Sequence, residues 1–447
     1  MNFLHNITNK RQLKFLTLTS LDFFLSFTLI KFILDKDLIH FKKIFNSHQL
    51  IIFILLWILI SYTRGRYLLN KKDKFFLKLI KDLKEIIIIS SITTIITFLM
   101  KIISLQNSFT SSNILLIFSI LIPVSILNQS IFYSLFENIK AKVINVFILG
   151  EDKEIKCIEE NFSDDNHNLY KFKIIKNIDD IVFAPDHLIV SSETALNKTN
   201  KNIIDKMFID GVEIYSSISW CEKFQQRIPT ELISLYESVN NQNIQNERNI
   251  QIILKRLGDI TLGFLLLIPS LPIIIISGLL IWINDKGPIF YSQTREGLFR
   301  KHIKITKLRT MRVDAEKNGP QWSSRNDDRI TFIGKFLRRM RIDELPQIFS
   351  VIKGEMSLIG PRPERPEFNI KLNELIPYYY LRNYVKPGLS GWAQVNYPYT
   401  ASLEDSKNKL SYDIYYIRNF SCWIDFLILF KTARIIFSGI GSIPLKK

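Results

Sequence analysis

Arginines and acids crowd together in one stretch of the chain, LRRMRIDELPQIFSVIKGEMSLIGPRPERP at residues 337–366. The charged residues before its first proline are Arg338, Arg339, Arg341, Asp343 and Glu344. A carboxylate can attack phosphorus as a nucleophile, but two anions repel each other unless cations neutralise the phosphate. Adjacent acids on a surface are usually only solvated, yet here arginines flank them and glycines and prolines shape the backbone that follows. The stretch therefore predicts a site that handles phosphates.

The acid pair also suits magnesium, which takes one or two carboxylates together with phosphate oxygens of a substrate. Phosphoryl or phosphosugar transfer from a nucleoside diphosphate needs this mixture of groups. Apolar residues at helical spacing predict a helix over 329–342, and Pro346 suits the first turn of a second helix. We therefore expect Asp343 and Glu344 at a bend between two helices, near a helix N-terminus that favours anions.

The composition indicates that this site belongs to a membrane protein. The chain has 447 residues, a formal net charge of +17 and 47% hydrophobic residues. These values favour membrane segments with basic cytoplasmic faces over a nucleic-acid-binding protein, although a general bias toward Ile, Lys and Asn explains part of the lysine excess. The length predicts two or three domains. The cysteines and histidines lack the spacing of a disulfide framework or a zinc site.

Four apolar runs fill the first third of the chain and predict a bundle of four transmembrane helices over residues 1–142. The segment between the second and third runs is densely basic, whereas the next connection carries almost no charge beyond Lys101. By the positive-inside rule, both ends of the bundle face the cytoplasm. The alternative is a set of buried helices in a soluble domain. The runs are Leu16–Leu34, Leu50–Tyr62, Glu85–Leu105 and Asn113–Ile131.

Residues 143–236 predict a small parallel α/β domain. A buried strand opens it, and short strands at 186–192 and 211–217 alternate with helical patterns. The sequence lacks the G-x-G-x-x-G turn of a dinucleotide site, so we expect a degenerate Rossmann-like domain with a regulatory or packing role. A polar linker rich in Asn and Gln, residues 237–249, separates it from the catalytic part, residues 250–447.

Residues 260–283 are apolar enough to cross a bilayer, but Pro269 and Pro272 stand around Ser270 in their middle. Each proline removes a backbone donor and clashes with the preceding turn, so we expect a break or sharp kink there. Ser270 could bond to backbone groups that the prolines free. Basic residues flank both ends, and a crossing helix would place one basic flank outside. A re-entrant hairpin is therefore favoured over a kinked spanning helix.

The catalytic part resembles a known family, the bacterial sugar transferases, which are monotopic phosphoglycosyl transferases acting on polyprenyl phosphate. Nine blocks in family-like order and spacing carry the resemblance, and the apolar runs with the degenerate α/β domain resemble the long form of the family. The blocks are KRLGD (255–259), IPSLP (268–272), GPIFYSQTREG (287–297), KLRTM (307–311), NDDRITFIGKFLRR (326–339), DELPQ (343–347), KGEMSLIGPRP (353–363), KPGLSGWAQVN (386–396) and YDIYYIRNFSCWIDFLILFKT (412–432).

The resemblance implies an undecaprenyl-phosphate sugar phosphotransferase. A UDP-sugar would donate its sugar-1-phosphate to undecaprenyl phosphate, releasing UMP, as the first membrane step of exopolysaccharide, capsule or O-antigen lipopolysaccharide synthesis. Glucose, galactose and N-acetylated sugars stay open, because the motifs show no sugar contacts. The implied location is the bacterial inner membrane, with the catalytic domain on its cytoplasmic face against the lipid bilayer. A homo-oligomer is compatible with the sequence, and no nucleic acid partner is expected.

The resemblance also assigns roles to individual residues. Asp343 would be the nucleophile that forms a phosphosugar-enzyme intermediate, and Glu344 would either bind Mg²⁺ with Asp343 or handle protons. The residues implied for phosphate or nucleotide binding are Arg338, Arg362, Pro361, Pro363, Lys307 and Arg309, and those implied for the hairpin break are Pro269, Ser270 and Pro272.

Four departures from the family pattern and two alternative interpretations accompany these roles. Leu308 stands where Phe is common, and Glu355 stands where Asp is frequent. Arg341 stands where a small polar residue is common, and Arg300 replaces an expected glycine. Both arginines could alter how phosphates are held. One alternative is direct attack by the lipid phosphate, with magnesium on the acids and no covalent intermediate. The other is a catalytically idle membrane scaffold or regulator of polysaccharide assembly, which would bind lipid phosphates without releasing UMP.

Overall fold

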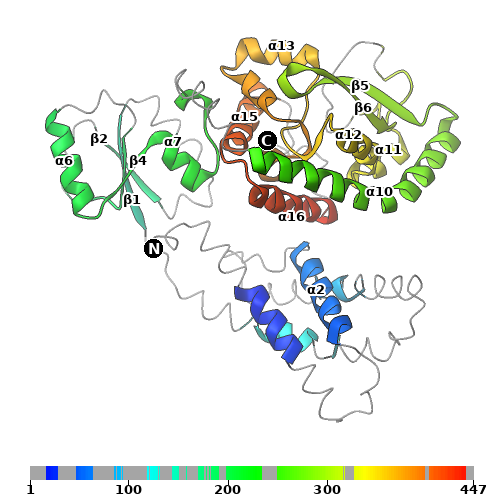
Figure 1. Cartoon of the computed structure of the whole chain (residues 1–447), viewed down its shortest axis with the longest axis horizontal. Coiled ribbons are helices and arrows are strands. Elements are labelled where there is room, and N and C mark those ends of the chain that lie inside the picture. The colour runs from blue at the N-terminus through cyan, green and yellow to red at the C-terminus, as the bar shows by residue number, and fades with distance from the viewer. Residues whose placement is uncertain are drawn as a thin grey trace. The chain divides into compact units, whose positions relative to one another are not determined.

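The computed structural model contains two compact units, Met1–Ala141 and Lys142–Lys447, each described here by itself (Figure 1). The residues that it describes are 17–28, 47–63, parts of 85–93 and 118–130, 143–150, 158, parts of 170–190, 198–233, 249–315, 317, 327–397 and 402–438.

Helical residues from all four predicted apolar runs occur in the first unit, including helix α2 (Ser47–Thr63). On α2, Phe53 and Trp57 pack against Phe118 of the fourth run, with ring centroids 5.5 and 5.8 Å apart. Ile89 of the third run belongs to the same buried cluster. The described parts of these runs thus share hydrophobic contacts. Most of the third run lies outside the described residues, and a four-helix transmembrane bundle stays a prediction.

A buried carboxylate joins the first and fourth apolar runs. Asp22 accepts hydrogen bonds from Ser125 Oγ at 3.0 Å and from Asn128 Nδ2 at 2.6 Å. All three side chains are buried. Because a buried carboxylate is costly without partners, these bonds fix which faces of the two helices meet.

Four parallel strands in the order β2-β1-β3-β4 open the second unit. They are β1 (Ile144–Leu149), β2 (Tyr170–Ile175), β3 (His187–Val190) and β4 (Glu213–Ser216), with helix α6 (Lys198–Ile209) before β4. The central strand β1 is buried from Val146 to Leu149, as expected of a parallel strand covered on both faces. The strands predicted at 186–192 and 211–217 are confirmed as β3 and β4.

The C-terminal domain contains mostly helices around two small sheets. Strands β5 and β6 form an antiparallel hairpin, and β7 pairs in parallel with β8. The elements are α10 (Asn249–Asp285), β5 (Phe290–Glu296), η5 (Leu298–Arg300), β6 (His302–Leu308), α11 (Phe332–Arg339), η6 (Ile342–Gln347), α12 (Ile348–Lys353), β7 (Ser357–Ile359), α13 (Pro366–Leu375), η7 (Tyr379–Tyr384), β8 (Gly388–Ser390), α14 (Trp392–Asn396), α15 (Leu403–Arg418) and α16 (Cys422–Ser438).

The segment that follows the parallel sheet packs onto this C-terminal domain. It comprises α7 (Ser217–Trp220), η3 (Cys221–Gln225) and η4 (Thr230–Leu232). Trp392 Nε1 donates to the carbonyl of Gln226 at 2.9 Å, and the N–H of Ile228 donates to the carbonyl of Ser411 at 2.9 Å. These two bonds hold α14 and α15 from outside the 250–447 segment, so the sequence boundary at the linker does not coincide with a break in packing.

Helix α10 contains Pro269 and Pro272 within one continuous element (Figure 1), where the sequence predicted a break or a sharp kink. Ser270 Oγ donates to the carbonyl of Leu266 at 2.6 Å, which adds a side-chain bond in the turn that the prolines weaken. The ribbon of α10 bends along its length (Figure 1). The helix therefore does not end at the prolines, and the hairpin stays a prediction.

Both ends of α10 are fastened to the same domain. Near its start, Lys255 Nζ forms an ion pair with Asp425 at 2.7 Å. At its end, Asp285 accepts a hydrogen bond from Arg309 Nη1 at 2.7 Å. Among the described residues, α10 holds the one helix, Ile250–Asp285, long and apolar enough to cross a membrane.

We predict that Gly334→Ala destabilises the fold, because a Cβ at Gly334 would overlap the carbonyl oxygen of Thr310. Helix α11 would have to move away from Thr310, which costs about 1–3 kcal/mol of unfolding free energy. The matched control is Gly258→Ala in α10, where the added Cβ meets no atom within 4 Å. There we expect a gain of about 0.5–1 kcal/mol. Thermal or denaturant unfolding in detergent measures both, and equal behaviour of the two variants would contradict the packing described.

Candidate active site

A tight turn presents the acid pair. Helix α11 ends at Arg339, and Arg341 adopts a left-handed conformation with φ of 56° and ψ of 21°. The chain then enters the 3₁₀ turn η6, which carries Asp343 and Glu344 and runs directly into α12. Non-glycine residues occupy the left-handed region only where surrounding contacts hold them there. The predicted bend between two helices is thus present, and Arg341 is its pivot.

Glu344 lies among three cations from three different segments. Its Oε1 contacts Arg362 Nη2 at 2.7 Å and Lys307 Nζ at 3.1 Å, and its Oε2 contacts Arg341 Nη1 at 3.5 Å. Burial by itself would raise the pKa of Glu344, but Arg362, Lys307 and Arg341 outweigh it and hold that pKa well below its usual range. Glu344 is therefore an anion at any physiological pH, and it gathers the positive charges of the site.

Asp343 lies next to this cluster in a different environment. The residue is 8% exposed, and its Oδ1 is buried without a hydrogen-bond partner among the described residues. Burial, and then the negative charge of Glu344, raise the pKa of Asp343 to about 6, while Lys307 and Arg338 act in the opposite direction. A carboxylate that is ionised at neutral pH with an oxygen left unbonded is suited to attack an electrophile.

The structure brings most of the predicted cations to the acids, but not Arg309. Arg338 Nε donates to Thr310 Oγ1 at 2.8 Å, close enough to Asp343 to lower the pKa of that carboxyl. Arg309 instead binds Asp285 and donates from Nε to the carbonyl of Pro288 at 2.6 Å. The structure therefore does not bring Arg309 to the acid pair, and its predicted anion contact stays a prediction. Strand alternation would place Arg309 on the same face as Lys307, but β6 ends at Leu308, so the side chain of Arg309 is free to turn toward Asp285.

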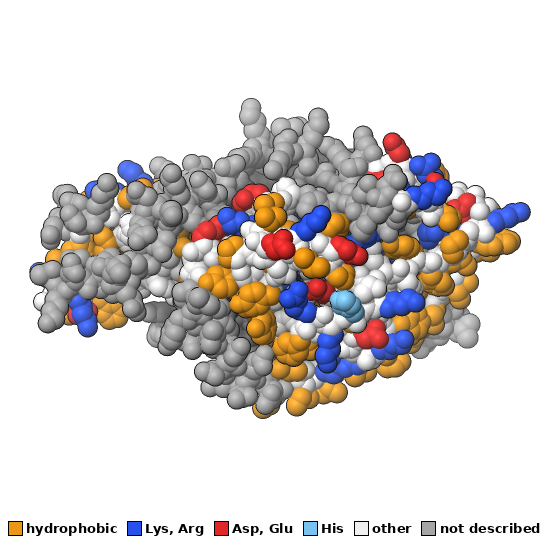
Figure 2. All heavy atoms as spheres, turned by 90° about the horizontal axis from the view of Figure 1, so that it is seen from above, with side chains coloured by type: hydrophobic (Ala, Val, Ile, Leu, Met, Phe, Trp, Pro, Cys, Tyr) orange, Lys and Arg blue, Asp and Glu red, His pale blue; other side chains and the backbone are white. Residues whose placement is uncertain are grey.

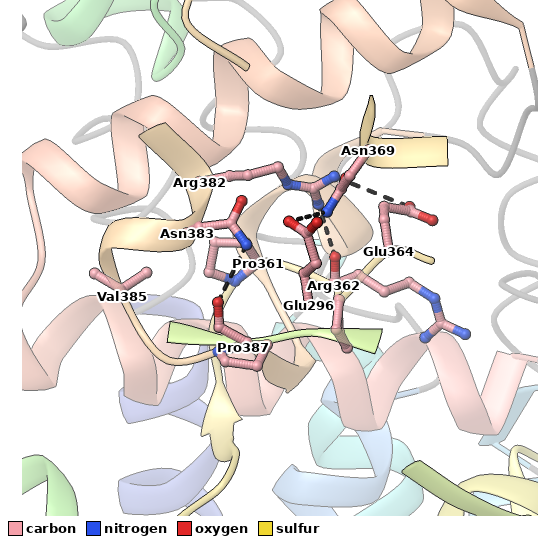
Figure 3. Close-up of a pocket in the computed structure, with 11 residues that line it drawn as sticks. Glu296, Pro361, Arg362, Glu364, Asn369, Arg382, Asn383, Val385 and Pro387 are labelled. Atoms are coloured by element: carbon pink, nitrogen blue, oxygen red, sulfur yellow. Dashed lines mark hydrogen bonds and ion pairs between the residues drawn. The ribbon is translucent and has the colours of Figure 1, made fainter. Parts of the chain in front are cut away.

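The turn of Pro361, Arg362 and Pro363 carries the guanidinium that reaches Glu344. It lies between β7 and α13, beside a small cavity (Figure 3). Figure 3 shows the carbonyl of Arg362 directed at Arg382 and its guanidinium directed away from the cavity. The residues lining the cavity are Glu296, Gly297, Pro361, Arg362, Pro363, Glu364, Asn369, Arg382, Asn383, Val385 and Pro387.

Of the two acids, Asp343 is better placed than Glu344 to bind a metal ion. Among the described residues, no group of three or more His, Cys, Asp or Glu side chains could hold one. Asp343 Oδ1 is an unbonded buried oxygen, whereas cations contact both oxygens of Glu344. A magnesium ion bound mainly by substrate phosphates needs only one or two carboxylates. Asp343 fits that requirement, and Glu344 fits it only by releasing cations, so the metal-ligand role predicted for Glu344 is not favoured.

Two residues near the acid pair or the turn at Arg362, Gln347 and Arg382, were not identified from the sequence. Gln347, within the DELPQ block, has a buried Nε2 without a hydrogen-bond partner among the described residues, one helical turn after Asp343. Arg382 contacts the turn at Arg362 from far along the chain, and nothing in its local sequence announces that contact. Gln347 could have been found from the sequence, because it belongs to the DELPQ block that carries the resemblance.

Comparison with known proteins matches residues 250–439 to the family model described as "Bacterial sugar transferase". A UDP-N-acetylgalactosamine-undecaprenyl-phosphate N-acetylgalactosaminephosphotransferase of Aeromonas hydrophila is 45% identical over 171 residues, covering 38% of this chain and 40% of the relative. A UDP-glucose:undecaprenyl-phosphate glucose-1-phosphate transferase of Escherichia coli (strain K12) is 40% identical over 183 residues, covering 40% and 39%.

A shorter relative is matched almost throughout. It is the exopolysaccharide production protein PSS of Rhizobium leguminosarum bv. phaseoli, 36% identical over 190 residues that make up 41% of this chain and 95% of the relative. The chain thus spans about two fifths of the length of the Aeromonas and Escherichia relatives. The three matches extend over 171, 183 and 190 residues, which is close to the length of the family-model match, residues 250–439.

We predict that Asp343→Asn stabilises the fold at pH 7.5 and not at pH 4. The native pKa of about 6 exceeds the ordinary 3.8, so the native state binds more protons than the unfolded state between these values. Stability therefore falls as pH rises through that window, by roughly 2–3 kcal/mol, and levels off above it. Asparagine has no charge to bury, so the variant should escape that loss.

Thermal unfolding in detergent at the two pH values measures the difference. Asp328→Asn, at an exposed position, is the matched control and should change stability little at either pH. A stability gain for Asp343→Asn that is the same at both pH values would contradict the ionisation of a buried carboxyl.

Proposed function

The chain belongs to the bacterial sugar transferase family, and from this premise we propose that it transfers sugar-1-phosphate from a UDP-sugar to undecaprenyl phosphate, releasing UMP. The observation that carries the proposal is Asp343, a buried carboxylate with an unbonded oxygen beside cations that converge on Glu344. Relatives whose names specify UDP-sugars and undecaprenyl phosphate support this choice of donor and acceptor. The product would serve exopolysaccharide, capsule or lipopolysaccharide synthesis.

In the first step, an oxygen of Asp343 attacks the phosphorus that bears the sugar. The bond from that phosphorus to the oxygen bridging the diphosphate breaks, and UMP leaves with the electron pair. The sugar phosphate is then attached to Asp343. In the second step, an oxygen of undecaprenyl phosphate attacks the same phosphorus and restores the Asp343 carboxylate. Each step exchanges one P–O bond for another, so no oxidant or reductant is required.

The cations around Glu344 make the first step feasible. Lys307 and Arg362 share Oε1 of Glu344, and the incoming diphosphate offers them more negative charge than a single carboxylate does. Positioned cations that neutralise a phosphate in a water-poor site lower the barrier for nucleophilic attack. Glu344 thus keeps the cations in place before substrate arrives. This role differs from metal binding and from proton handling.

A magnesium ion, held by Asp343 and substrate phosphate oxygens, would supply further positive charge when bound. The residues of the chain then divide the work. Arg338 lies against Thr310 near Asp343, where it favours the ionised carboxylate. Direct attack by the lipid phosphate, the alternative mechanism, would use the same cations but would leave the oxygen of Asp343 without a phosphorus bond.

We further propose that α10 enters the bilayer and returns to the cytoplasmic face. A straight helix of 37 residues would be about 55 Å long, well beyond the bilayer core of about 30 Å. Yet Lys255 and Asp285, near its two ends, bind the same domain, which a span would place on opposite sides. Exposed apolar side chains along α10, including Leu265, Ile268 and Ile275, support contact with lipid.

The rest of the domain surface fits such a location. Phe332 and Phe336 on α11 are 88% and 60% exposed, and Lys335 and Arg339 are exposed on the same helix. Figure 2 shows hydrophobic side chains beside Lys and Arg side chains on the face that it displays. Exposed aromatic groups next to basic groups suit the interface of an anionic leaflet. This supports a site at the cytoplasmic surface of the inner membrane, where a soluble donor meets a lipid acceptor.

UMP release with undecaprenyl phosphate and Mg²⁺ in detergent, across a panel of UDP-sugars, tests the proposed activity. We expect release with at least one UDP-sugar, a loss of at least about 10³-fold for Asp343→Asn, and unchanged release for Asp328→Asn. If no UDP-sugar yields UMP, the idle-scaffold alternative gains support. Full turnover by Asp343→Asn would remove Asp343 from the mechanism.

The side of the membrane is tested by a single cysteine at Lys371, an exposed position of α13, in a chain whose three natural cysteines are changed to serine. We expect an impermeant thiol reagent to label Lys371→Cys in lysed cells and not in intact spheroplasts. The expectation follows from a returning α10. Labelling in intact spheroplasts would mean that α10 spans the bilayer and would place the catalytic domain outside.

A further inference from the structure

Arg382, on η7, is a buried cation with three kinds of partner. Its Nη2 forms an ion pair with Asp413 of α15 at 3.1 Å and donates to the carbonyl of Arg362 at 2.7 Å. Its Nη1 donates to the hydroxyl of Tyr379 and lies 4.0 Å from Glu364. Arg382 is 9% exposed. A buried guanidinium is costly unless it is paired and hydrogen-bonded, and these partners meet that need. The question is what the buried Arg382 does for the structure around it.

Arg382 helps to hold the turn of Pro361, Arg362 and Pro363 in place. The prolines on either side have no N–H to donate, so the turn can be fastened mainly through its carbonyls. All three carbonyls are engaged: that of Pro361 by the N–H of Gly388 at 2.9 Å, that of Arg362 by Arg382, and that of Pro363 by Arg295 Nη1 at 3.0 Å. Two of these three donors are arginine side chains.

The carbonyl and the side chain of Arg362 point in different directions (Figure 3). The carbonyl faces Arg382, and the guanidinium extends to Glu344 at 2.7 Å. Holding the carbonyl therefore sets the direction from which the guanidinium approaches the acid pair. A displacement of about 1 Å in a positioning group can cost on the order of 10²-fold in rate.

We propose that Arg382 is a positioning residue for the transfer reaction, which acts by holding the carbonyl of Arg362 so that the Arg362 guanidinium reaches the phosphate. Asp413 holds Arg382 from α15, at the other end of the same chain of contacts. Arginine suits this place because its rigid fork can bind a carboxylate and a carbonyl at once, which the point charge of lysine cannot do. The inference rests on the proposed function, because the phosphate is that of the UDP-sugar.

The packing of α15 extends the contacts further. Ser411, two residues before Asp413, accepts the N–H of Ile228 at 2.9 Å. Arg227 Nη1 donates to Asn408 on the same helix at 3.3 Å. The helix that holds Arg382 is thus itself held by the segment that follows the parallel sheet.

A double-mutant cycle between Arg382 and Arg362 tests the proposal by UMP release. We expect Arg382→Gln to lower kcat/KM about 10–100-fold in the native background and by less than about threefold in an Arg362→Ala background. Arg382→Lys should lose activity similarly, because it keeps the charge but not the fork. The unfolding temperature of Arg382→Lys, measured in the same detergent, shows whether this variant is folded.

Asp425→Asn is the matched control, since it breaks a half-buried ion pair with Lys255 in which neither Arg362 nor Arg382 takes part. Its effect on kcat/KM should be the same in both backgrounds. If the double variant loses kcat/KM by the product of the two single losses, the two residues act independently. Arg382 then supports the fold and does not position Arg362, and the inference is overturned. If the native protein releases no UMP from any UDP-sugar, the proposed function fails instead.

Discussion

Three cations share the carboxylate of Glu344, and the chemistry of the site depends on that charge balance. Without Glu344, Lys307 and Arg362 would repel each other across a buried space that has little water to screen them. With Glu344, they stay close together and leave the neighbouring carboxylate, Asp343, with an unbonded oxygen. Two adjacent acids thus differ in role because their surroundings differ. One gathers positive charge, and the other is left reactive.

The same balance explains why distant parts of the domain converge on one turn. Lys307 comes from β6, Arg341 from the left-handed bend after α11, and Arg362 from the turn before α13. Each must approach Glu344 from a fixed direction, so each backbone segment is tied down separately. Arg382 and Arg295 hold the turn at Arg362, and the contact with Thr310 holds Arg338. Rigid placement is what allows cations to act on a phosphate without reorganising first.

The sequence predicted the reactive centre better than its supports. Asp343, Glu344 and Arg362 lie in compact blocks, and short-range spacing is enough to predict the bend that carries the acids. The pairing of Arg309 with Asp285 was not predictable, because sequence alternation places Arg309 near Lys307 but cannot show that Asp285 lies within its reach. Arg382 was missed because its partners, Arg362 and Asp413, lie 20 and 31 residues away along the chain. Such contacts depend on tertiary packing, which no local pattern encodes.

The long helix shows a different limit. Pro269 and Pro272 predicted a break or a sharp kink, since each removes a backbone donor, and the sequence could not decide between them; α10 continues through both. A helix can bend at proline and continue, and here the Ser270 hydroxyl adds a bond to the carbonyl of Leu266 in the same turn. Strands β1 and β3 of the parallel sheet were predictable, because they are short apolar runs, whereas β2, with lysines between its apolar residues, was not predicted. The packing of the segment after it against α15 was not, because main-chain bonds such as that of Ile228 leave no mark in the sequence.

The covalent use of Asp343 is the central claim, and one trapping measurement tests it most directly. The protein is incubated with Mg²⁺ and a UDP-sugar labelled in the sugar phosphate, in the absence of undecaprenyl phosphate, then digested and examined by mass spectrometry. The account predicts labelled sugar phosphate on the peptide that contains Asp343, accompanied by one UMP released per site. Release of UMP only when lipid acceptor is present, with no labelled peptide under any condition, would contradict it.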